Sequence, residues 1–113
     1  MIPLGVEIFV ARKTIDLHSS FDRLSGIVRE AIGRDPRGRA MFVFFGRRRD
    51  AIKVLFHDGS GFCIFYKRLD RGSFRMPGDD DDPSEHITLE PHELDALLDG
   101  IDVTKRLPRP RVH

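Results

Sequence analysis

The sequence predicts a single α+β domain, with an antiparallel meander sheet of about four to five strands packed by one amphipathic helix and a short C-terminal helix. A chain of 113 residues, 40% of them hydrophobic, suits one compact domain with its own core. Three apolar runs rich in β-branched and aromatic residues follow one another between residues 41 and 69, and helical periodicity is confined to two segments. We place the domain at residues 1–104 and expect a flexible basic tail at residues 105–113, because its prolines and charges bury little surface.

The N-terminal part predicts one strand followed by one helix. GVEIFVA, residues 5–11, has the β-branched and aromatic content of a strand. In SSFDRLSGIVREAIG, residues 19–33, apolar side chains recur at helical spacing, Ser19 or Ser20 can cap the start, and Gly33 can end the helix. The apolar positions of this helix are Phe21, Leu24, Ile27, Val28, Ala31 and Ile32.

Three further strands are predicted after a Pro- and Gly-containing connector: MFVFF at 41–45, AIKVLFH at 51–57 and GFCIFYKRL at 61–69. Asp58-Gly59 favours a tight hairpin between the last two, with His57 opposite Phe62. Alternation then places Ile52, Val54, Phe56, Cys63, Phe65 and Lys67 on one face, which we expect to be the core face. The other face, Lys53, Leu55, His57, Phe62, Ile64 and Tyr66, is either half covered or a recognition surface.

The C-terminal part predicts a loop, a short strand and a short helix. MPGDDDDPSE, residues 76–85, is a loop by composition, and HITL, residues 86–89, is a possible edge strand. In EPHELDALLDGI, Pro91 suits the first turn of a helix that Gly100 ends, with Leu94, Leu97 and Leu98 as an apolar stripe.

We expect a cytoplasmic protein. No apolar run approaches the roughly 18 residues needed to span a bilayer, and the N-terminal residues lack the features of a secretory signal. Cys63 is the only cysteine and lies within an apolar run, so we interpret it as a buried structural thiol.

Catalytic motifs are missing from the sequence, and we predict no enzymatic activity, metal or cofactor. The five histidines have no zinc-like spacing, and there is no P-loop or nucleophile-elbow motif. Asp35, Asp50 and Asp58, with Lys53, come nearest to the carboxylate cluster of a metal-dependent nuclease. These carboxylates fall in predicted turns, where aspartate is common for structural reasons.

Charge is distributed unevenly along the chain. Residues 29–75 hold twelve Lys or Arg against five Asp or Glu, a net of +7, whereas residues 76–102 hold ten acidic residues and no Lys or Arg. Such a basic segment suggests an anionic partner.

An arginine cluster is the candidate binding site. Guanidinium groups bind phosphate bidentately, and several together produce salt-dependent nucleic-acid binding. The predicted nucleic-acid-binding residues are Arg47, Arg48, Arg49, Lys53, Lys67, Arg68 and Arg71. We expect Arg34, Arg37, Arg39 and Arg75 to converge on the same rim of the sheet, with Tyr66 and Phe74 available for stacking. A second interpretation, that these charges only keep strand ends soluble, is about equally compatible with the sequence.

A specific series of motifs runs through the chain: a phenylalanine-rich strand, then G-R-R-R-D, I-K-V-L, D-G-x-G, Y-K-R-L and R-G-x-F, followed by ITLEPHELDALLDGID. In these motifs the chain resembles the accessory protein encoded upstream of the transposase in insertion sequences of the IS66 family, called TnpB but unrelated to the RNA-guided nuclease of that name. Positions matching the pattern are Asp16, Phe21, Asp22, Arg47, Arg48, Lys53, Asp58, Gly59, Gly61, Lys67, Arg68, Gly72 and Phe74. The chain departs from it where Asp16 to Ser19 replaces D-M-R-K and where a tryptophan is missing near Met76.

The resemblance implies a bacterial protein that works beside a separately encoded transposase. We therefore predict a non-enzymatic accessory protein for DNA transposition that contacts element DNA through the arginine-rich rim. The alternative is a protein-interaction module that docks on the transposase without contacting DNA. It would use either the leucine stripe or the face that carries Leu55, Phe62 and Ile64. A nuclease is the third and weakest candidate.

Overall fold

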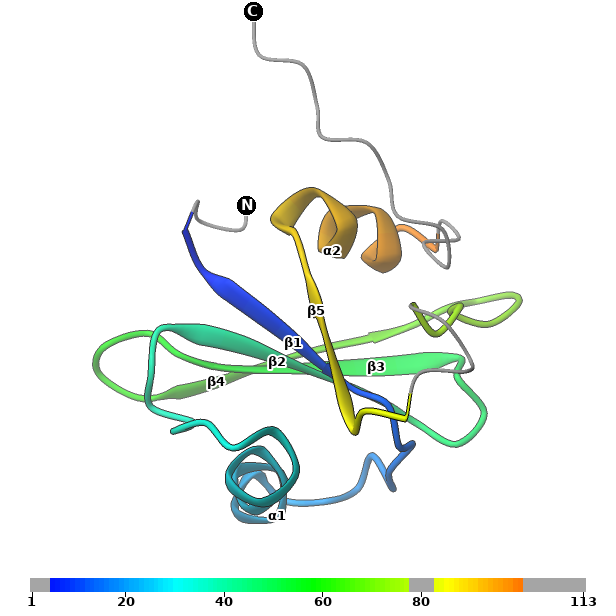
Figure 1. The fold of residues 1–113 in the computed structure, drawn as a ribbon. Coiled ribbons are helices and arrows are strands. Elements are labelled where there is room, and N and C mark those ends of the chain that lie inside the picture. Colours follow the sequence, from blue (N-terminus) through cyan, green and yellow to red (C-terminus); the bar gives the residue numbers. More distant parts are fainter. Residues whose placement is uncertain (1–4, 78–82, 101–113) are drawn as a thin grey trace, which may run out of the picture.

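A five-stranded sheet with a helical segment on each face forms the protein (Figure 1). The structure is a computed structural model, and it describes residues 5–77 and 83–100. The elements in chain order are β1 (Glu7–Ala11), α1 (Phe21–Ile27), the π-helix η1 (Val28–Ile32), β2 (Ala40–Phe45), β3 (Ala51–His57), β4 (Phe62–Arg68), β5 (His86–Leu89) and α2 (Pro91–Leu98). The α+β class and the consecutive β2–β3–β4 meander are confirmed.

The sheet differs from a purely antiparallel one in a single pairing. Its order is β4-β3-β2-β1-β5, and β1 runs parallel to β2 with Phe9 opposite Phe42. The physical reason is the helical segment between these two strands, which carries the chain back across the sheet, as a parallel connection requires. The carboxyl ends of β1 and β2 consequently lie at the same end of the sheet.

The β3–β4 hairpin has the predicted register, with His57 opposite Phe62. The Asp58 Oδ1 atom accepts hydrogen bonds from the N–H groups of Ser60 and Gly61, both at 2.9 Å, and Gly59 adopts a φ of 102°. These hydrogen bonds lower the pKa of Asp58 to about 2. Asp58 is therefore a turn-forming carboxylate.

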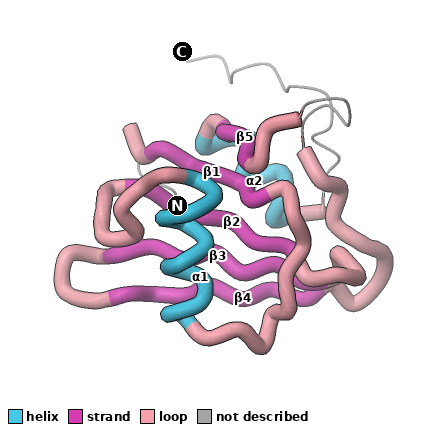
Figure 2. The backbone as a smooth tube through the Cα atoms, turned by 60° about the horizontal axis from the view of Figure 1, so that its bottom comes forward, coloured by secondary structure: helices cyan, strands magenta, loops and turns pink. Residues whose placement is uncertain are grey.

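Both faces of the inner strands are buried, because α1 and α2 cover opposite faces of the sheet. On the edge strand β4, Phe65 is expected on the core face but is 45% exposed. Ile52 and Val54 pack with residues of α2, as expected for the predicted core face. Leu55 points the other way and is also fully buried, in a cluster with residues of α1 and η1. Figure 2 shows α1 crossing the strands of that face. The prediction that the core lies on one face of the sheet is therefore wrong.

The helix ends follow the predicted signals. Ser20 caps α1, its Oγ atom accepting from the N–H of Arg23 at 3.5 Å, and Gly33 ends η1 in the left-handed conformation. Glu90 and Glu93 form a capping box at the start of α2. Leu94 and Leu97 lie within the core, so the leucine stripe is used inside the domain.

Strand β4 is the exposed edge of the sheet. Ile64, Phe65 and Tyr66 are 40%, 45% and 50% exposed. Cys63 is half-buried rather than buried because it belongs to this edge, and burial together with the Asp58 carboxylate raises the pKa of its thiol. Within residues 5–77 and 83–100, no helix has the length and apolar character needed to cross a membrane. Two predicted segments lie outside the described residues: the four consecutive aspartates at 79–82 and the tail at 105–113.

Candidate nucleic-acid interface

The arginine cluster occupies the turn between β2 and β3. The N–H of Arg49 donates to the carbonyl of Gly46 at 2.9 Å, and the N–H of Gly46 donates to Ala51 at 3.1 Å, which closes the turn. Arg47, Arg48 and Arg49 are all exposed. Arg49 has a φ of 58°, the left-handed region in which a side chain is disfavoured, and it is the only such non-glycine residue in the described ranges.

The loop after β4 is fastened to this turn. The Leu69 N–H donates to the Asp50 carbonyl at 2.8 Å, and the Phe74 N–H donates to the Arg49 carbonyl at 2.6 Å. Arg71 lies in the loop between these two attachment points, and Arg68 pairs with Asp50 at 3.5 Å. The structure therefore brings Arg47, Arg48, Arg49, Arg68 and Arg71 to one end of the sheet, and we call these five residues the basic end.

Phe74 does not take the stacking role expected for it. Its side chain is 1% exposed and meets the Phe45 ring edge-on at 6.2 Å between centroids. It is a core residue because the loop folds back under the turn. Tyr66, in contrast, is half exposed on β4.

Lys53 and Lys67 lie beside the basic end on opposite faces of the sheet. Lys67 directly precedes Arg68, Lys53 is the third residue of β3, and the register places the two lysines on different faces. The Nζ atom of Lys67 donates to the carbonyl of Leu98 at 2.5 Å, at the C-terminus of α2. Lys67 is thus held against α2, and the two lysines do not share one face of the sheet.

The arginines of the connector before β2 do not join the same rim. That connector enters the sheet at the end opposite to the arginine turn, because β2 runs from one end to the other. The guanidinium of Arg34 pairs with Glu7 at 3.6 Å and lies 5.0 Å from the centre of the Phe9 ring. The guanidinium of Arg37 lies 5.3 Å from the Phe62 ring. The prediction that they converge with Arg47 is wrong.

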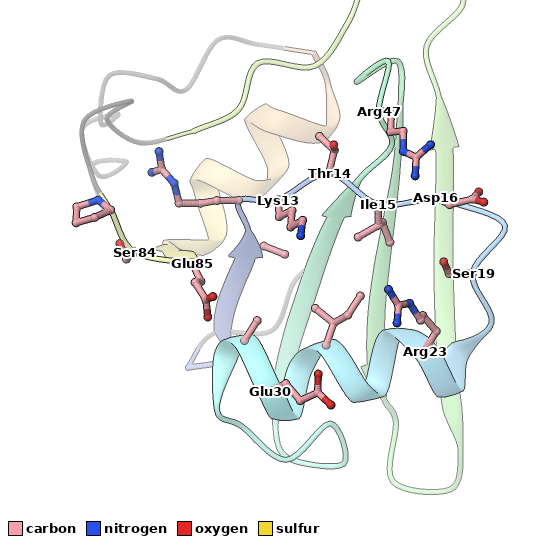
Figure 3. Close-up of a pocket in the computed structure, with 15 residues that line it drawn as sticks. Lys13, Thr14, Ile15, Asp16, Ser19, Arg23, Glu30, Arg47, Ser84 and Glu85 are labelled. Atoms are coloured by element: carbon pink, nitrogen blue, oxygen red, sulfur yellow. The ribbon is translucent and has the colours of Figure 1, made fainter.

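A groove beside the basic end is lined by basic side chains that are not among the predicted site residues. It has a volume of about 920 Å³ and lies between α1, the segment after β1 and residues 83–85. Figure 3 shows Arg23 from α1 and Arg47 from the arginine turn directed toward the same space. Lys13 and Arg12 also line it. The parallel β1–β2 pairing explains this grouping, since it places the residues after β1 next to those after β2.

Carboxylates share the groove with these cations. Asp16, Glu30 and Glu85 line it, so its charge is mixed. The N–H of His18 donates to the Asp16 carboxylate at 2.9 Å, and this bond, with the His18 ring and the nearby Arg47, lowers the pKa of Asp16. An incoming anion would meet Arg23 and Arg47 with Asp16 ionised beside them.

The carboxylates considered for a metal-dependent nuclease do not lie together in the fold. Asp50 lies at the basic end, whereas Asp35 and Asp58 lie in turns at the opposite end of the strands, where each accepts main-chain N–H groups. In the part of the chain that the structure describes, no three His, Cys, Asp or Glu residues are grouped so that they could hold a metal ion.

A family model described as "IS66 Orf2 like protein" matches residues 6–107. The chain belongs to this family. Two relatives come from Sinorhizobium fredii strain NBRC 101917 / NGR234: uncharacterized protein y4hO is 38% identical over 104 residues, 90% of this chain and 88% of the relative, and uncharacterized protein y4jC is 30% identical over 106 residues, 94% and 88%. No solved structure matches significantly. Membership of the IS66 Orf2-like family implies an accessory protein of an insertion sequence.

Proposed function

We propose that this IS66 Orf2-like protein assists transposition, beside the transposase of the same element, by contacting element DNA through the basic end. Five arginines from two separate segments gather there, and main-chain hydrogen bonds hold the two segments together. Arginine is the side chain best suited to bidentate phosphate binding. Since neither a helix-turn-helix nor a zinc site is found among the described residues, contacts to the DNA backbone fit better than readout of base edges.

The observation that carries the proposal is the conformation of Arg49. Its left-handed backbone costs an L side chain about 1–2 kcal/mol, and glycine would adopt the same φ at little steric cost. Strained backbone of this kind clusters at functional sites, which favours a functional role for this side chain. Phosphate binding fits that role, because its neighbours Arg47 and Arg48 present the same charge to solvent.

The groove offers a place where the DNA backbone can continue from the basic end. Arg47 belongs both to the arginine turn and to the groove wall, so a phosphate chain held by Arg48 and Arg49 would pass it next. Arg23 faces the same space from α1 (Figure 3). The carboxylates of Asp16 and Glu30 limit how many phosphates the groove can accept, because like charges repel.

Fluorescence anisotropy with the terminal DNA of the element and with an unrelated duplex, across a salt series, tests the proposal. We expect binding that weakens as salt rises. Changing Arg47, Arg48 and Arg49 together to alanine should reduce the slope of log K against log salt by up to about 3, at about 0.9 for each phosphate that is no longer neutralised. The matched control changes Arg34, Arg37 and Arg39 to alanine, which removes the same charge from the opposite end of the sheet. Equal losses of affinity in both triple variants would show a general charge effect and contradict a defined interface.

The second candidate function is docking on the transposase without contact to DNA. Of the contact residues predicted for it, Leu55, Leu94 and Leu97 are core and Ile64 is exposed. The other two, Phe62 and Leu98, are half-buried. Capture of the purified transposase by wild type and by the arginine triple variant alike, with no DNA binding at low salt, would favour this candidate.

A further inference from the structure

Strand β4 is an edge strand, and its outer side pairs with no other strand among the described residues. It is seven residues long, stands at the end of the strand order, and contains no proline. Three consecutive large apolar side chains on it, Ile64, Phe65 and Tyr66, are 40–50% exposed. Exposed edge strands present unpaired N–H and C=O groups and invite another strand to pair.

The hydrogen bonds of the β3–β4 ladder show which groups point outward. The N–H of Asp58 donates to Gly61 and the N–H of Leu69 donates to Asp50, at the two ends of the ladder. Hydrogen-bonded pairs alternate along an antiparallel ladder, so Val54 and Phe65 form such a pair midway. The N–H and C=O of Phe65 therefore face β3, and those of Ile64 and Tyr66 face away from the sheet.

We propose that two copies of this chain pair antiparallel through β4, around a two-fold axis at Phe65. In that register all seven residues of β4 overlap, from Phe62 opposite Arg68 of the second copy onward. Ile64 of one copy lies opposite Tyr66 of the other, and these are the residues whose backbone groups face outward. The two Phe65 residues meet as a non-hydrogen-bonded pair, the kind in which side chains approach most closely.

The charge pattern of β4 favours a second copy in this orientation. Its only charges are Lys67 and Arg68 at one end, and the hairpin at its other end carries Asp58, whose low pKa keeps it ionised. Antiparallel pairing separates the cations of the two copies and moves each pair toward Asp58 of the other. Parallel pairing would place the like charges side by side, which destabilises strand pairs.

The topology also limits the assembly to two copies. Pairing through β4 uses up that edge in both copies, and the remaining edge strand of each sheet is β5, which has only four residues. An isologous contact of this kind closes on itself. Only one seven-residue strand of each copy takes part in the pairing, so we expect weak association with a dissociation constant of roughly 10⁻⁶ to 10⁻⁴ M.

Sedimentation equilibrium over a concentration series of the full chain, combined with amide hydrogen exchange, tests the dimer. We expect a monomer–dimer equilibrium in which the Ile64 and Tyr66 amides gain protection as concentration rises. The amides of Cys63 and Phe65, which already bond to β3, should change little. This alternation distinguishes strand pairing from contact between side chains alone.

Two variants and one control sharpen the test. Ile64→Pro removes an outward N–H while sparing the ladder to β3, a position where an edge strand tolerates proline, and should weaken dimerisation at least tenfold. Phe65→Lys should do the same by placing two cations at the two-fold axis. Thr88→Lys places the same charge at an exposed position of β5, the other edge strand, and should leave the dimer unchanged.

Three outcomes would overturn the proposal: a monomer at every concentration with Ile64 and Tyr66 amides that exchange freely, a dimer that survives Ile64→Pro in a folded protein, or protection of these amides only when the transposase is added. The last would assign the edge to that partner. None of these outcomes depends on DNA binding, so the dimer and the proposed function fail separately.

Discussion

The N–H of Phe74 donates to the carbonyl of Arg49 with an N···O distance of 2.6 Å, which joins a core side chain to the arginine turn. Phe74 is 1% exposed, so its buried ring fixes the position of the loop after β4. The hydrogen bond then fixes the backbone of Arg49 relative to that loop. The position of the basic end therefore depends on core packing.

Truncating Phe74 should destabilise the domain strongly. We expect Phe74→Ala to lower the free energy of unfolding by about 3–5 kcal/mol, because a buried phenyl group is removed and a cavity remains. Urea denaturation followed by circular dichroism measures it. Phe21→Ala, at a side chain 44% exposed, should cost about 1 kcal/mol or less. Similar losses of stability in both variants would contradict the anchoring role.

Arg49→Gly should separate stability from binding. Relief of a left-handed side chain is worth about 1–2 kcal/mol and the added chain entropy costs about 0.5–1 kcal/mol, so the variant should be more stable by about 0.5–1 kcal/mol. DNA binding should nevertheless weaken through loss of one cation.

The matched control for Arg49→Gly is Arg48→Gly. This variant removes the same charge at the preceding residue, where φ is not positive. We expect the same loss of DNA affinity, with stability lowered by about 0.5–1 kcal/mol. Denaturation and anisotropy on the two variants give both quantities. A stability change of the same sign in the two would refute the assignment of strain to Arg49.

Local patterns in the sequence predict most of the elements. The Asp58-Gly59 turn and strict alternation fix the β3–β4 register, and Ser20 and Gly33 mark the helix ends, because each signal acts within a few residues. The parallel pairing of β1 with β2 has only a weak local signal, the helix between two strands. Burial of Leu55 beneath α1 follows from that non-local arrangement.

The sequence predicts those site residues that are adjacent in the chain. It does not predict those that the fold brings together from distant segments. Arg47 to Arg49 adjoin in sequence, so their common turn is evident from it. Lys13 and Arg23 reach the groove beside Arg47 only through the β1–β2 pairing. Phe74 lies in a polar loop without periodicity, and no pattern distinguishes it from an exposed aromatic residue.

Asp58 should make the stability of the hairpin depend on pH in the acid range. Its pKa is lowered from 3.8 to about 2, so the carboxylate stabilises the folded state fully above about pH 4, and this contribution is lost as pH falls toward 2. Asp58→Asn keeps an acceptor for the Ser60 and Gly61 N–H groups but cannot titrate. The difference in thermal midpoint between wild type and variant should be greatest above pH 4 and disappear near pH 2. A difference independent of pH would contradict the turn assignment.

Lys67 should act on stability and not on DNA binding. Its Nζ atom donates to the Leu98 carbonyl at the C-terminus of α2, where a cation also interacts favourably with the helix dipole. We expect Lys67→Met to lower the free energy of unfolding by about 1 kcal/mol, since the aliphatic stem is largely kept and the charge-assisted hydrogen bond is removed.

Lys53→Met is the matched control, on the opposite face of the same strand pair, and should change stability by less than about 0.5 kcal/mol. Urea denaturation and salt-dependent anisotropy on both variants give the comparison. If Lys67→Met instead leaves stability unchanged and reduces the salt slope by about 0.9, Lys67 contacts a phosphate. The interface would then extend from the basic end along β4, and the α2 contact would be secondary.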